Sequence, residues 1–267
     1  MKPETRQAAE LNCRLLMLSM IPVALSMVCT LIIRENPYAG YLGGLIGAAA
    51  GVILCRIFGM HRPFGEQLRS FDVKLCLIYF LLVETGSRLA FSFGGLILSQ
   101  FLSASAPGTE APTTLTRVLL IAAVTPVLEE LIYRTGMVGV LKKGGSRLIS
   151  VLYPAVFFMF AHTAKGMQGK LSVLTAGVIL ALCYYETGNI LYPVAAHALH
   201  NLAGFADQSF LFRQANGFFV LKTPVLILYG VIFLFSAIRL VRGFRKKHAA
   251  EEPQAEQESP LHTEENR

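Results

Sequence analysis

Long runs of apolar residues restrict this chain to one broad class of fold. Residues 11–33 and 73–101 contain few charges, and a helix needs about 20 apolar residues to cross the hydrocarbon core of a bilayer. The 267-residue chain is 54% hydrophobic and only 15% charged, whereas soluble domains carry about 25% charged residues. The sequence therefore predicts an all-α fold, a polytopic membrane helical bundle.

Eight apolar segments can be drawn as transmembrane helices. They cover residues 11–33, 38–58, 73–101, 115–141, 148–164, 171–187, 190–211 and 223–242. The third segment is long and contains Gly86, Gly94 and Gly95, which predicts a tilt or a kink. We expect residues 1–247 to form one transmembrane helical domain. Residues 248–267 are polar and acidic, which is typical of a disordered tail.

Lysine and arginine positions indicate the orientation of the bundle. With eight spans, the basic segments around 58–73, 142–147 and 239–247 fall on one side, and such loops stay in the cytoplasm. Both termini, including the tail, are therefore expected there, in a multi-pass protein of the cell membrane. The small size and the acidic tail indicate a bacterial protein. The net charge of +7 is not spread as a nucleic-acid-binding face would be, so the lipid bilayer and not nucleic acid is the expected partner.

Glu129 and Glu130 lie together inside the fourth apolar segment. A carboxylate at bilayer depth is costly unless it is paired or hydrated, and such residues mark functional sites. Arg134 follows Glu130 by four residues, so the two can pair on one helix face. A buried ion pair that only fixes helix packing is the alternative explanation. Glu129 points about 100° around the helix from Glu130, and we expect it to be the functional carboxylate.

Histidines and an asparagine occur in the fifth and seventh segments. His162 follows Phe158 by four residues, and Asn201 follows His197 by four, so each pair shares a helix face. At about 1.5 Å per residue, Glu129, His162 and Asn201 lie roughly 20 Å from the expected cytoplasmic ends, and His197 lies roughly 14 Å in. Polar groups at similar depth on three helices predict a buried aqueous site.

These residue types can support peptide hydrolysis. A carboxylate and an imidazole can hold a water and remove its proton, while a second histidine and a carboxamide can stabilise an oxyanion. A zinc version is also open, because Glu and His suit zinc with one position left for water. The HExxH pairing is absent, as are a GxSxG elbow and a cysteine beside a histidine.

Three short motifs follow one another in the core segment 115–205. They are EExxxR at Glu129 to Arg134, FxxxH at Phe158 to His162, and HxxxN at His197 to Asn201. In this order, on apolar helices, they resemble the CPBP family, the CAAX-protease and bacteriocin-processing or Abi family, which includes the CAAX prenyl endopeptidase. The resemblance implies an intramembrane endopeptidase with an eight-helix architecture. Its substrate would be a peptide or a lipid-anchored or membrane-bound protein, and prenylation is not implied.

The resemblance also implies a role for each motif residue. Glu129 and His162 would activate the water, and His197 and Asn201 would stabilise the oxyanion. The supporting residues would be Glu130, Arg134 and Phe158. Zinc, held by Glu129, His162 and His197, and a metal-free glutamate mechanism both remain open. His200 is outside the motifs, and we expect it to face away from the site or toward a neighbouring helix.

Glu84 and Arg88, four apart on the third segment, fall at a similar depth and would line or brace the same cavity.

A non-catalytic membrane scaffold or regulator with the same fold is the main alternative to the protease. A transporter or proton pathway also uses glutamate and histidine, but the sequence shows no repeated half of the kind that transporters have.

Overall fold

The computed structural model describes residues 3–32, 39–59, 71–102, 114–143, 146–162, 166–206 and 209–257. The long helices are α1 (Pro3–Ile32), α2 (Ala39–Ile57), α4 (Val73–Phe101), α8 (Arg147–Ala161), α9 (Met167–Thr187), α10 (Leu191–Ala203) and α11 (Thr223–Gln257). Together with a helical stretch over 115–141, they occupy all eight predicted apolar segments. Among the described residues, three helices are long and apolar enough to cross a membrane: α4, α9 and Thr223–Arg245 of α11. The predicted helical membrane fold is therefore present, and the number of eight crossings stays a prediction.

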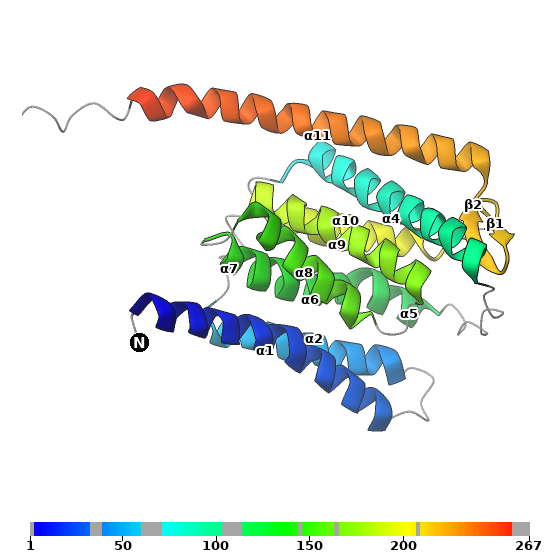
Figure 1. Cartoon of the computed structure of the whole chain (residues 1–267). Helices are drawn as coiled ribbons and strands as arrows, with labels where there is room; N and C mark the ends of the chain where they lie inside the picture. Colours follow the sequence, from blue (N-terminus) through cyan, green and yellow to red (C-terminus); the bar gives the residue numbers. More distant parts are fainter. Residues whose placement is uncertain are drawn as a thin grey trace, which may run out of the picture.

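The helices lie side by side, with α9 and α10 in the middle of the bundle (Figure 1). α11 packs on α4 at one edge, and α1 and α2 form a pair at the other. α4 contacts α9, α10 and α11, and these helices share a core around buried Tyr79, Leu180 and Ala196. α10 has only 13 residues, about 20 Å of helix. Its short length suits a helix that is enclosed by its neighbours.

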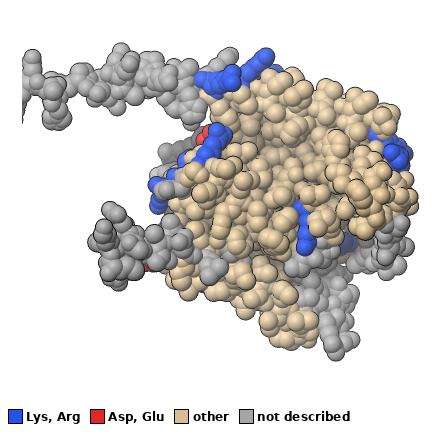
Figure 2. Space-filling model, in the orientation of Figure 1, with Lys and Arg blue, Asp and Glu red and all other residues tan. Residues whose placement is uncertain are grey.

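The outward faces of the bundle are apolar. On α11, Leu228, Val231 and Phe235 are each more than half exposed. Figure 2 shows most of the visible lysine and arginine near the left and right ends of the molecule and one basic group in its lower middle, with other residues over most of the face between them. Lipid-facing surfaces have this character, because hydrocarbon cannot solvate charges.

Residues 115–141 form one helical stretch in which the hydrogen-bond spacing changes. α5 (Leu115–Leu119), α6 (Thr125–Glu130) and α7 (Gly139–Leu141) are α-helical, whereas η1 (Leu120–Val124) and η2 (Leu131–Val138) are π-helical. π-helical turns are rare and occur frequently at functional sites. Glu129 and Glu130 therefore lie at the end of a short α-helical piece between two widened turns.

The seventh predicted segment is longer than the helix that occupies it. α10 ends at Ala203 instead of residue 211, and an antiparallel hairpin follows, made of β1 (Phe212–Ala215) and β2 (Phe218–Leu221). Asn216 and Gly217 have φ values of 47° and 81°. The sequence signal for this hairpin is the Asn-Gly pair, because two-residue turns need positive φ at both positions. The all-helical prediction missed it.

Small residues on α4 let the hairpin come close to the helix. Gln168 of α9 donates from Nε2 to the carbonyl of Phe91 at 3.0 Å and also to the carbonyl of Phe219. A Cβ added at Gly95 would lie 2.8 Å from the Phe219 carbonyl oxygen, which is closer than packed atoms allow. The glycines of this segment therefore permit close packing. They do not interrupt the helix, since α4 is continuous from Val73 to Phe101.

α11 extends into the predicted tail. The tail was expected to start at residue 248, whereas α11 continues to Gln257. Residues 248–257 are rich in Ala, Glu and Gln, which are strong helix formers, so the helix can continue beyond the apolar segment. Residues 258–267 lie outside the described residues.

Candidate active site

Glu130 and Arg134 form a buried ion pair. Arg134 Nε donates to Glu130 Oε2 at 2.7 Å, Arg134 Nη2 lies 3.4 Å from Oε1, and both side chains are 0% exposed. Breaking such a pair is costly, because the remaining charge stays buried without compensation. The ion pair that the four-residue spacing predicts is therefore present.

His197 contacts both glutamates from the middle of α10. Its Nδ1 lies 2.9 Å from Glu130 Oε1, and because an ionised carboxylate can only accept, Nδ1 is assigned as the donor. Its other nitrogen, Nε2, lies 3.8 Å from Glu129 Oε2. In neutral His197, Nε2 is an acceptor that faces Glu129.

Glu129 differs from Glu130 in having a carboxylate oxygen without a partner. Its Oε2 atom is buried and has no hydrogen-bond partner among the described residues. A buried polar atom in this condition is unfavourable. Two acceptors 3.8 Å apart cannot bond to each other, but a water between them can donate one hydrogen to each. The geometry thus separates a structural glutamate from one that is ready to bind a water.

Phe158 brings the two motif histidines to one aromatic ring. The ring centres of His162 and His197 lie 4.6 and 5.7 Å from that of Phe158, both edge-on. His162 caps the end of α8, and its Nδ1 lies 2.8 Å from the Phe158 carbonyl oxygen. Because a carbonyl only accepts, Nδ1 donates, and neutral His162 has its acceptor at Nε2. Arg134 Cζ also lies 5.3 Å from the centre of the Phe158 ring.

Asn201 is tied to the π-helical turn before the glutamates. Its Nδ2 donates to the Ile121 carbonyl at 2.9 Å. In η1 the N–H of Thr125 bonds to the carbonyl of Leu120, five residues earlier. At the same spacing, the partner of Ile121 would be Pro126, which has no N–H. Asn201 therefore supplies the hydrogen bond that Pro126 cannot make, and it keeps a second N–H.

A second carboxylate cluster lies on α4. Arg88 Nε donates to Glu84 Oε1 at 2.8 Å, and His200 Nδ1 lies 2.6 Å from Glu84 Oε2. His200 thus faces a neighbouring helix, as expected from its place outside the motifs.

The predicted zinc ligands are Glu129, His162 and His197. The described part of the chain contains no group of three or more His, Cys, Asp and Glu side chains that could hold a metal ion. Glu129 and His197 are close, but His162 does not complete a set with them. Zinc requires ligand atoms at about 2.0–2.2 Å from one point, so the predicted set does not fit a zinc site in this arrangement.

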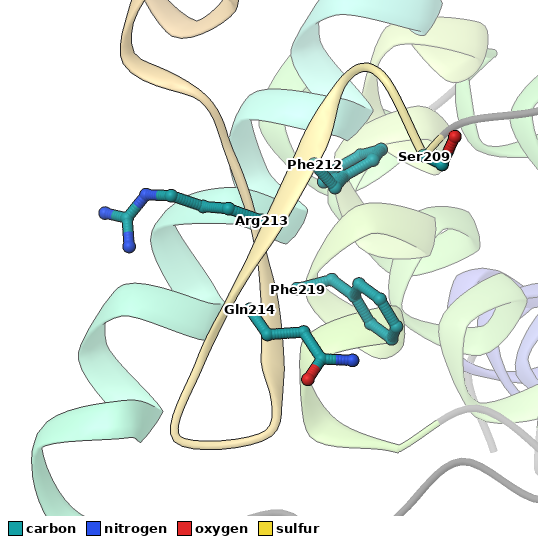
Figure 3. A pocket seen from close by; sticks show the side chains of 5 residues that line it. All are labelled: Ser209, Phe212, Arg213, Gln214 and Phe219. Carbon is teal, nitrogen blue, oxygen red and sulfur yellow. The ribbon is translucent and has the colours of Figure 1, made fainter.

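A pocket of about 370 Å³ lies beside the hairpin and contains none of the predicted site residues (Figure 3). It is lined by Ser209, Phe212, Arg213, Gln214 and Phe219. The side chains of Phe212 and Phe219 point to one side of the hairpin, whereas Arg213 points to the other. The Phe212 ring centre lies 5.8 Å from Arg88 Cζ. The pocket is therefore next to the α4 cluster.

Residues 111–203, which contain all three motifs, match the family model described as Type II CAAX prenyl endopeptidase Rce1-like. This match confirms the resemblance to the CAAX protease family that the three motifs indicate. No curated protein and no solved structure matched the chain. The matched region runs from the glutamate-bearing helix to the end of α10.

Proposed function

We propose that the protein is an intramembrane endopeptidase that hydrolyses a peptide bond with a glutamate-activated water. The observation that carries this proposal is the buried Glu129 Oε2 without a partner, 3.8 Å from His197 Nε2. The protease-family domain over 111–203 supports the class of reaction.

In the proposed reaction, Glu129 is the general base. A water donates one hydrogen to Glu129 Oε2 and the other to His197 Nε2, and Glu129 removes a proton as the water oxygen attacks the carbonyl carbon. Glu130 holds His197 through Nδ1, which keeps Nε2 directed at the water. His162 is proposed as the second imidazole at the water, the role that the family resemblance implies.

The attack produces a tetrahedral oxyanion that needs hydrogen-bond donors. Asn201 is proposed as one donor through its second N–H, because its first is bonded to Ile121. His197, the second donor that the family resemblance implies, can donate only when Nε2 carries a proton. The proton on Glu129 then passes to the leaving amine as the C–N bond breaks, which restores the carboxylate.

The proposed substrate is a membrane-associated peptide or a lipid-anchored protein, and the site does not specify a prenyl group. We further propose eight membrane crossings in a bacterial cell membrane, with both termini in the cytoplasm. The lysines and arginines around 58–73, 142–147 and 239–247 support this orientation.

The test is the substitution Glu129→Gln, which keeps the shape and removes the base. Membrane proteomics of cells with wild type or this variant identifies the precursor that accumulates, and purified protein in liposomes is then given that precursor. We expect turnover to fall by about 10²–10⁴-fold with the unfolding temperature retained. The matched control is Glu186→Gln, a glutamate that pairs with Arg147 outside the site.

Two outcomes would contradict the proposal in different ways. Full turnover in Glu129→Gln would remove Glu129 as the base. A cellular phenotype that persists in this variant, with no precursor accumulating, would instead favour the non-catalytic scaffold.

A further inference from the structure

Two histidines of α10 each contact a glutamate that is paired with an arginine. His197 Nδ1 contacts Glu130 at 2.9 Å, and His200 Nδ1 contacts Glu84 at 2.6 Å. In each pair the arginine follows the glutamate by four residues and donates through Nε, at 2.7 and 2.8 Å. The two histidines are three residues apart, so they lie on faces of α10 about 60° apart.

We propose that Glu84, with Arg88, is a positioning residue that sets the rotation of α10 through His200. A helix of 13 residues is too short to be anchored by its length in the bilayer. The His197–Glu130 and Asn201–Ile121 contacts both tie α10 to the glutamate-bearing helix, on one side. The hydrogen bond at His200 ties α10 to α4 from another direction, which fixes its rotation, and it lies directly beside Asn201 in the chain.

The α4 cluster, made of Glu84, Arg88 and His200, has the contacts of a positioning network and not those of a site that binds a reactant. Each Glu84 carboxylate oxygen has a partner, Arg88 at Oε1 and His200 at Oε2. Glu129, by contrast, has a buried oxygen without one. A saturated carboxylate–arginine–histidine network is rigid, which is what a positioning role requires.

The network also connects parts of the chain that the family match separates. Glu84 and Arg88 precede the matched region, which begins at residue 111, whereas His200 lies within it. Arg88 Cζ lies 5.8 Å from the Phe212 ring, so the cluster joins α4, α10 and the hairpin. The segment before the matched region thereby helps to orient α10, the helix that carries His197 and Asn201.

The test compares His200→Asn with His200→Leu in the full-length protein. The Asn amide nitrogen can replace Nδ1 as the donor to Glu84, whereas Leu has similar bulk and no donor. The first measurement is nitrogen NMR of isotope-labelled histidine, which reports the Nδ1–H of His197 and needs no substrate. We expect the His197 signal to be retained in His200→Asn and shifted or broadened in His200→Leu. An unchanged signal in His200→Leu overturns the proposal.

The second measurement is turnover, which rests on the proposed function. Because α10 carries groups that act in the transition state, we expect kcat to fall about 10–100-fold in His200→Leu, with KM changed by less than about twofold. His200→Asn should stay within about threefold of wild type. A kcat as low in His200→Asn as in His200→Leu would mean that the imidazole itself is required, and would overturn the positioning role.

Two further variants keep the test decisive. If His200→Leu does not fold, the double variant Glu84→Leu with Arg88→Leu replaces it, because it removes the acceptor of His200 without leaving a single buried charge. An unchanged His197 signal and an unchanged kcat in that variant would overturn the proposal. Leu199→Ala, at a 37% exposed position on α10, is the control and should change neither. If wild type itself cleaves no peptide while the NMR result holds, the proposed protease function fails and the positioning network stands.

Discussion

Asn201 donates its side-chain amide to the carbonyl oxygen of Ile121 at 2.9 Å and so joins α10 to the glutamate-bearing helix. The carbonyl is available because Pro126, at the π-helical spacing, has no N–H. A helix-breaking residue and a candidate oxyanion donor therefore act as one structural unit. The bond to Ile121 also fixes the plane of the amide, which gives the second N–H of Asn201 a defined direction.

We expect Asn201→Ala to lower kcat by about 10²–10³-fold with little change in KM, because a transition-state donor is lost. It should also lower the free energy of unfolding by about 1–3 kcal/mol, since the Ile121 carbonyl loses its partner. Adding Pro126→Ala restores an N–H that can bond Ile121. The double variant should regain stability but not turnover, as measured by thermal unfolding and steady-state kinetics. Recovery of both would show that Asn201 is only structural.

The Glu130–Arg134 pair predicts an unequal response to single and double substitution. Arg134→Met should lower the free energy of unfolding by about 3–5 kcal/mol, because Glu130 is left as a buried charge. Combining it with Glu130→Gln removes that charge and should return part of the loss. Thermal unfolding of the three proteins in one detergent measures this. A double variant less stable than Arg134→Met would contradict the assignment.

Gly95→Ala should loosen the hairpin. The new methyl group would lie 2.8 Å from the Phe219 carbonyl oxygen, and overpacking of this kind costs about 1–3 kcal/mol. Gly230→Ala is the control, because a Cβ there has nothing within 4 Å. We expect limited proteolysis to cut the 209–222 segment faster in Gly95→Ala alone. Equal protection of both variants would contradict this close approach.

The ligand geometry predicts that turnover does not depend on zinc. The described residues contain no three-ligand set for a metal, so we expect purified protein to remain active after treatment with a chelator. Elemental analysis of the same sample provides the comparison. Loss of activity on chelation, with recovery on adding zinc, would show that Glu129, His162 and His197 converge on a metal in the working enzyme.

Local patterns were sufficient to predict most helices and the pairing of Glu130 with Arg134. Apolar segments and the four-residue spacing of Glu130 and Arg134 are properties of one helix, and both appear in the structure. The early end of α10 was missed, because apolar residues still follow Ala203 in the sequence. The hairpin was missed because residues 212–221 lie between the predicted segments 190–211 and 223–242, where only a connection was expected. The Asn216-Gly217 turn was the available signal.

By itself, the sequence determined the helical membrane class, the three motifs and the split between Glu129 and Glu130. These depend on composition and on spacing within one helix. Only the tertiary structure decided that His197 faces both glutamates, that His200 pairs with Glu84 and that Asn201 reaches Ile121. Those contacts join residues between 67 and 116 positions apart. They depend on how each helix is rotated against its neighbours, and packing of the whole bundle sets that rotation.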